Sequence, residues 1–258
     1  MTDEELLSLN QSGFIPGPDE TEPDFVKRVE STKQAFFKLG VSAIPPSHWD
    51  WVGNTLRELF DFTPSCLPVF YSNSSLMPWQ GAAAWVERGQ ILAIQLRDSL
   101  KKGSFLGIYQ RSEILAHESV HAARSAFPFD RWDEFFAYKT SKASWRRVLG
   151  PIVQRPWEVW PFLVFCLLGS FFPAFFLGSA LWMGLGFYRL IRCHRILRLA
   201  CAFLKKIGLT SKTARSLLVR LTDSEIVNLA RGVVPALKET NLRGRLIRLA
   251  YKELWHKK

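Results

Sequence analysis

The chain is poor in the residues that most often build disulfide frameworks and thiol sites. Its 258 residues include only 4 cysteines, and no two of them form a CxxC pair. We therefore interpret Cys66, Cys166, Cys193 and Cys201 as reduced structural residues rather than as parts of a disulfide framework. The sequence also lacks a phosphate-binding glycine loop, a nucleophile elbow and an internal repeat, so it gives no indication of nucleotide, serine-hydrolase or repeat architectures.

A leader peptide is not expected either. The first residues, Met1 to Leu6, are acidic rather than basic and apolar, so a secretory or organellar signal is not predicted. Residues 1–23 hold three prolines and several acidic residues. This composition predicts a loose acidic arm in front of the first domain.

Histidine is scarce, with only 5 in the chain, yet two histidines lie in the pentapeptide His117-Glu118-Ser119-Val120-His121. The surrounding segment, 111–124, has good helix formers and no glycine or proline, which predicts a helix. Residues i and i+4 share a helix face, so both imidazoles can bind one cation. Glu118 can then reach a water on that cation and take its proton, which predicts a zinc hydrolase site.

A catalytic zinc needs a third protein ligand. The nearest downstream carboxylates are Asp130, Asp133 and Glu134. Asp130 and Asp133 resemble a capping pair that opens a second helix, on which Glu134 and Tyr138 share a face. We predict Glu134 as the third ligand and Tyr138 as a hydrogen-bond donor to a developing oxyanion or to a ligand. Asp133 is the alternative ligand and otherwise a neighbour that supports the ligands.

An HExxH helix followed by a glutamate on the next helix resembles the gluzincin zinc metallopeptidases, especially the small members. The resemblance covers roughly residues 65–145. It implies His117, His121 and Glu134 as zinc ligands and Glu118 as general base. The subfamily stays unassigned, because the gap from His121 to Glu134 is shorter than in the thermolysin-like members and no NExxSD-type block follows.

The segment before the motif helix predicts a small sheet. Residues 67–71, 81–87 and 90–96 are strand-like, and Arg88-Gly89 is typical of a hairpin turn. Such a sheet would offer an edge to which an extended peptide substrate can add as a strand. The alternative is a hairpin that only covers one face of the motif helix.

A long apolar stretch follows this domain. From Val159 to Tyr188, 30 successive residues carry no charged side chain. This length predicts a membrane segment within 156–190, either a hairpin bent near residues 169–173 or a single span. Its interfacial anchors would be Trp157, Trp160, Trp182 and Tyr188. Basic flanks on both sides favour a hairpin with the catalytic domain on the cytoplasmic side.

The charge is divided unevenly along the chain. Residues 1–158 hold 17 Lys and Arg against 19 Asp and Glu, a net of −2, whereas residues 159–258 hold 17 against 4, a net of +13. For the basic tail, 191–258, we expect amphipathic helices, with starts at Thr210 or Ser211 and at the capping box Thr222–Glu225. Anionic lipid headgroups are the expected partner of this tail; nucleic acid is not expected, and a solvated basic surface is the alternative.

Together these patterns predict an α+β protein. It would consist of a zincin-like N-terminal domain (24–155), a hydrophobic membrane hairpin (156–190) and a basic helical C-terminal domain. The predicted function is a membrane-associated, zinc-dependent metallopeptidase that hydrolyses peptide bonds of a peptide or protein substrate with a zinc-activated water. The alternative is a non-catalytic, membrane-anchored scaffold or binding protein, with a structural or vestigial zinc site and a lipid-binding tail.

Overall fold

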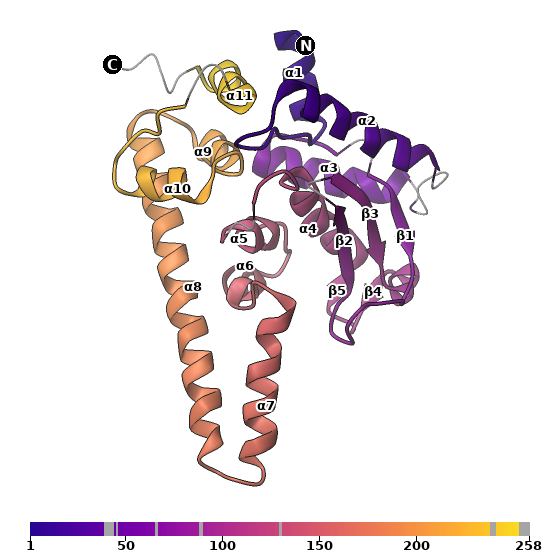
Figure 1. Ribbon diagram of the computed structural model, residues 1–258, viewed down its shortest axis with the longest axis vertical. Coiled ribbons are helices and arrows are strands. Elements are labelled where there is room, and N and C mark those ends of the chain that lie inside the picture. The colour runs from indigo at the N-terminus through magenta and orange to yellow at the C-terminus, as the bar shows by residue number, and fades with distance from the viewer. Residues whose placement is uncertain are drawn as a thin grey trace.

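The computed structural model describes residues 1–38, 44, 46–64, 67–87, 90–128, 131–237 and 241–252. The fold is mostly helical, with one three-stranded and one two-stranded sheet (Figure 1). The predicted α+β class is therefore only loosely consistent with the structure. Cys66, Asp130 and the turn Arg88-Gly89, which the sequence singled out, lie outside the described residues.

The first part of the chain contains three helices, the strands and the motif helix. Its elements are α1 (Asp3–Gln11), α2 (Glu22–Lys38), α3 (Pro46–Phe60), β1 (Val69–Tyr71), β2 (Ala82–Glu87), β3 (Gln90–Leu96), η1 (Asp98–Lys102), β4 (Ser104–Phe105), β5 (Tyr109–Gln110) and α4 (Arg111–Ala123).

Within the described residues, the regular elements of the second part are all helices. Its elements are α5 (Asp133–Tyr138), α6 (Ser144–Leu149), η2 (Gly150–Ile152), η3 (Pro156–Glu158), α7 (Val159–Gly169), α8 (Phe175–Lys206), α9 (Ser211–Leu218), α10 (Asp223–Ala230) and α11 (Leu242–Ala250). The predicted helix starts in the tail are confirmed, since Thr210 caps α9 and Thr222 with Glu225 forms a capping box on α10.

The main sheet has the strand order β1-β3-β2. The expected antiparallel pairing of β2 with β3 is present, with Ala84 opposite Ile94. β1 runs parallel to β3 on its other side, with Val69 opposite Ile94. β2 is consequently an edge strand, and α4 packs beside it.

One hydrophobic core joins the two parts of the chain. It contains Leu56 of α3, Ile94 of β3, Leu115 and Val120 of α4, and residues of the C-terminal helices such as Ile226. The C-terminal helices thus share buried apolar contacts with the motif helix, and burial of such side chains is the main favourable contribution to folding.

The segment expected to form a loose arm is structured. Residues Asp3–Gln11 form α1, which begins with a capping box between Thr2 and Glu5. Leu6 is fully buried in a second apolar cluster, together with Phe25 of α2 and Leu246 of α11. Figure 1 accordingly shows α1 and α11 at the same end of the molecule. The prediction of a loose arm is wrong because it relied on the proline and acidic content of the segment. A few apolar residues, placed so that they can be buried against other helices, are enough to order it.

The prediction of a membrane segment is wrong. The apolar stretch does form a hairpin, in which α7 and α8 run side by side away from the sheet (Figure 1). However, no helix within the described ranges combines the length and the apolar character that crossing a bilayer requires. The stretch is divided at 170–174, so the 11 residues of α7 reach only about 16 Å, against about 30 Å of hydrocarbon. The predicted membrane location is therefore wrong, and the cytoplasmic placement that was inferred from it loses its basis.

Polar contacts fix the base of the hairpin. Arg189 of α8 donates to both carboxylate oxygens of Glu158, at 2.8 and 2.6 Å, and to the carbonyl of Ile152. Trp182, one of the predicted anchors, donates its indole N–H to the Glu158 carbonyl at 3.0 Å. Many apolar side chains are exposed at this base and along the hairpin; these include Trp157, Trp160, Leu167, Phe171, Phe172, Leu181 and Tyr188.

A buried ion pair attaches the start of the motif helix to α6. Glu113 of α4 accepts hydrogen bonds from Arg146 Nη2 at 2.8 and 3.0 Å, and Arg146 also donates to the Ile108 carbonyl. Both side chains are about 5% exposed. The backbone N–H of Lys142 donates to the same Glu113 carboxylate. This pair therefore links α4 to the chain that follows α5.

Replacing Glu113 with glutamine should destabilise the fold by about 3–5 kcal/mol, because it leaves the Arg146 charge buried without its counter-ion. Urea denaturation of wild type and variant measures the difference. Asp98→Asn is the control, since the Asp98–Lys101 pair is largely exposed and should change stability far less. Equal, small effects of the two substitutions would contradict the role assigned to Glu113.

Candidate metal centre

The pentapeptide lies on a helix whose other faces are held by the core. A capping box between Gln110 and Glu113 begins α4. Leu115, Ala116 and Val120 are fully buried, which fixes the rotation of the helix about its axis. The predicted helix is thus confirmed, with Arg124 as its C-cap. His117 and His121, one turn apart, share the face that remains.

The second ligand-bearing helix is short and begins later than predicted. α5 starts at Asp133 with Trp132 as its N-cap. Phe135 and Ala137 are fully buried, and Trp132 is as well. Because these residues pack into the core, Glu134 is directed toward α4.

The three predicted ligands meet at one point. Nε2 of His117 lies 3.4 Å from Oε2 of Glu134, and Nε2 of His121 lies 3.3 Å from Oε1 of the same residue. The two Nε2 atoms are 3.2 Å apart. Within the part of the chain that the structure describes, these residues are the one group that could hold a metal ion.

The spacing of these donor atoms fits a tetrahedral ion. Nitrogen and oxygen donors lie about 2.0–2.1 Å from zinc, and two such donors on a tetrahedron are then about 3.3 Å apart. The three measured distances, 3.2, 3.3 and 3.4 Å, lie around this value. Two imidazoles and one carboxylate form three of four vertices, which is the donor set of a catalytic rather than a closed structural site.

Without a metal ion the three groups form a charged cluster. Burial opposes protonation of His121. The negative charge and hydrogen bond of Glu134, together with the charges of Glu118 and Asp133, outweigh this effect and raise the pKa of His121 to about 9. Burial likewise opposes ionisation of Glu134, yet the two histidines hold its pKa well below the usual range. A metal ion would replace the proton on His121, so binding at neutral pH should release it.

Glu118 is a buried carboxylate beside this cluster. Its residue is 9% exposed, and its negative charge contributes to the raised pKa values of both His121 and Tyr138. Within the described residues its side-chain carboxylate takes part in no hydrogen bond or ion pair. A carboxylate near the ligands with no structural partner is available to accept a proton.

Tyr138 lies next to His117. The two rings meet edge to face, with their centroids 4.8 Å apart. Burial, and then the charge of Glu134, raise the pKa of Tyr138 above its usual range, so the phenol keeps its proton. Gly150 allows this placement, because a Cβ atom there would overlap the Tyr138 ring. Tyr138 therefore places a protonated phenol ring against the ligand His117.

Asp133 is not a ligand but a neighbour. Its Oδ1 lies 2.5 Å from Nε of Arg124, and it is absent from the metal-binding group. Among the other described histidines, His48 contacts Arg111, while His194 lies near the Val148 carbonyl and Phe135. Sequence reasoning gave no role to Arg124, and its acceptors Val219 and Leu221 are too far along the chain for any local pattern to indicate them.

The edge strand β2 lies next to the motif helix, where an extended substrate was predicted to bind. Among the strands that the structure describes, β2 pairs only with β3. Trp85 and Val86 of β2 are each 46% exposed. Just before β2, Trp79 meets Trp160 of α7 edge to face, with centroids 5.7 Å apart. Trp160, predicted as a membrane anchor, is therefore in contact with the loop that leads into this edge.

No protein-family model, curated protein or solved structure matches the chain. The resemblance to the gluzincins consequently stays a prediction, carried by the motif and the ligand geometry alone.

The charged cluster makes a prediction for protein stripped of metal with a chelator. Glu134→Gln should lower the His121 pKa from about 9, because burial then acts without its main opposing charge. An NMR pH titration of the imidazole resonances measures the change. Glu58→Gln, an exposed residue of α3, is the matched control and should leave the His121 pKa unaltered. An unshifted His121 pKa in Glu134→Gln would mean that the carboxylate does not face the ring.

Proposed function

We propose that the protein is a zinc-dependent metallopeptidase whose ligands are His117, His121 and Glu134. The observation that carries this proposal is the set of donor distances, 3.2–3.4 Å, between two imidazoles and one carboxylate from two separate helices. Those distances suit one tetrahedral ion with a vertex left for water or substrate. When bound, zinc lowers the pKa of a water ligand and polarises a substrate carbonyl.

The residues around the ligands have complementary roles in this proposal. Glu118 accepts a proton from the attacking water and returns it to the leaving amine. Its burial and its lack of a structural partner among the described residues support this role. Tyr138, which keeps its proton, donates a hydrogen bond to the oxyanion of the tetrahedral intermediate.

The peptide would bind along β2. An edge strand offers unpaired backbone groups to which an extended chain can add, and alternate side chains then face the site. The exposed side chains of Trp85 and Val86 on this strand support contact with an extended ligand. This choice of substrate separates a peptidase from other zinc-dependent hydrolases.

Glu118→Gln tests the proposed chemistry. The variant should bind zinc as wild type does, because Glu118 is not a ligand, but should cleave a generic peptide pool at least about 100-fold more slowly for want of a general base. Mass spectrometry of the pool gives the rate, and metal analysis gives the zinc content. Glu58→Gln makes the same chemical change on the surface and should retain full activity.

Two outcomes would overturn the proposal. Wild-type activity in Glu118→Gln would remove that residue from the general-base role. Zinc-loaded wild type that cleaves no peptide would instead favour the non-catalytic alternative, in which the metal site is structural.

A further inference from the structure

Arg124 ends the motif helix and has a side chain that is completely buried. Its exposed fraction is 0%, and its Nε atom lies 2.5 Å from Oδ1 of Asp133. Asp133 begins α5 and directly precedes the ligand Glu134. The guanidinium also lies over the rings of Phe127 and Phe136, 4.3 and 5.2 Å from their centroids. Arg124 thus connects the end of one ligand helix to the start of the other.

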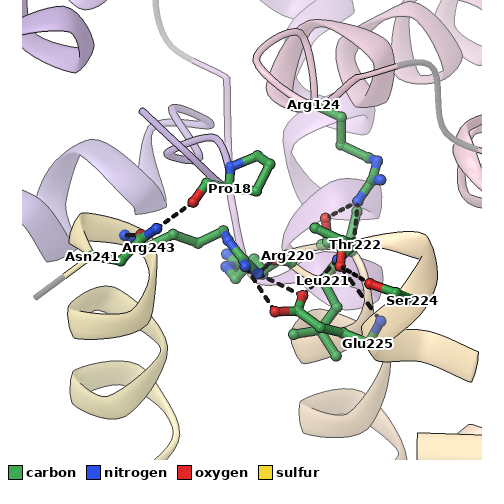
Figure 2. Close-up of polar contacts among 10 residues, drawn as sticks. Pro18, Arg124, Arg220, Leu221, Thr222, Ser224, Glu225, Asn241 and Arg243 are labelled. Atoms are coloured by element: carbon green, nitrogen blue, oxygen red, sulfur yellow. Dashed lines mark hydrogen bonds and ion pairs between the residues drawn. The ribbon is translucent and has the colours of Figure 1, made fainter. Parts of the chain in front are cut away.

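The other side of the guanidinium contacts the C-terminal helices. Nη1 of Arg124 donates to the carbonyl oxygens of Val219 and Leu221, in the turn between α9 and α10. Figure 2 shows the guanidinium pointing at the backbone of this turn near Leu221. A buried guanidinium requires such acceptors, since leaving its N–H groups unpaired is costly. The turn therefore fixes the direction of the side chain that holds Asp133.

A second contact joins the same two regions. The backbone N–H of Arg131, just before α5, donates to Oδ2 of Asp223 at 3.3 Å. Asp223 is the first residue of α10. The entrance to α5 is consequently attached to the start of α10 both through Arg124 and directly.

We propose that Arg124 is a positioning residue of the metal centre, and that the turn between α9 and α10 is needed for the site to form. The inference rests on the metal site of the proposed function. Arg124 reaches Asp133 and the turn at once because its planar fork donates in several directions, which a lysine ammonium on a flexible stem does not reproduce. Through Asp133 it sets the distance of Glu134 from His117 and His121.

Zinc affinity tests the proposal without any assay of activity. Arg124→Lys, Arg124→Gln and Asp133→Asn should each bind zinc about 10- to 100-fold more weakly than wild type, the usual effect of losing a partner that orients a metal ligand. Competition with a chromophoric chelator measures the dissociation constant. The absorption spectrum of the cobalt-substituted proteins should also change, because the ligand geometry changes.

Arg28→Gln is the matched control. Arg28 is a buried arginine of α2, with a side chain that is 5% exposed, and it pairs with Glu20 and donates to the Ile15 carbonyl rather than to α5 or the turn between α9 and α10. Its loss should lower thermal stability yet leave the zinc affinity and the cobalt spectrum unchanged. Losses in Arg124→Gln and Asp133→Asn should not add up in the double variant, because both remove one interaction.

The outcomes separate this inference from the metal site itself. Wild type that binds no zinc would overturn the site. Wild-type affinity in Asp133→Asn, whose side chain is 25% exposed and whose substitution the fold should tolerate, would overturn the positioning role while leaving the site intact. An equal loss of affinity in Arg28→Gln would also overturn it, because the effect would then reflect general destabilisation.

Discussion

The placement of α5 against α4 is the constraint on which the site depends. His117 and His121 share a helix and are one turn apart, so their separation follows from helix geometry. The position of Glu134 does not follow from this geometry, because Glu134 lies on a separate helix. That helix, α5, has only 6 residues, and the residues packed around it determine where it lies. A displacement of about 1 Å would take its carboxylate out of reach of an ion held by both histidines.

Buried arginine–carboxylate pairs supply much of this placement. Glu113 with Arg146 holds the start of α4, and Arg124 with Asp133 joins its end to α5. Removing one partner of such a pair leaves a buried charge without its counter-ion, so each junction is sensitive to the loss of either partner. Glu118 differs from these carboxylates in having no such partner among the described residues, and this difference suits a group that exchanges protons.

The local parts of this arrangement could be predicted from the sequence. The motif helix follows from a segment without glycine or proline, and the shared face of Glu134 and Tyr138 follows from their i, i+4 spacing. The pairing of Arg124 with the Val219 carbonyl could not be predicted, because 95 residues separate the two and no periodic pattern links them. The strands β4 and β5 were missed because each has only two residues.

The apolar stretch shows where composition misleads. Thirty uncharged residues are enough for a membrane span, but the count ignores the bend at 170–174 that divides them into a short α7 and the first part of α8. The sequence did predict the bend. Each of the two uncharged segments that it separates is too short to cross a bilayer, and the stretch forms a hairpin fixed at its base by Glu158, Trp182 and Arg189.

The metal content of the purified chain tests the central claim most directly. Zinc bound per chain should be measured by mass spectrometry of the metal after dialysis against a weak chelator, for wild type, His121→Ala and Glu134→Ala. The geometry predicts one zinc per chain in wild type and a large loss in both variants, with the fold retained. Folded wild type without zinc, or equal zinc in all three proteins, would contradict it.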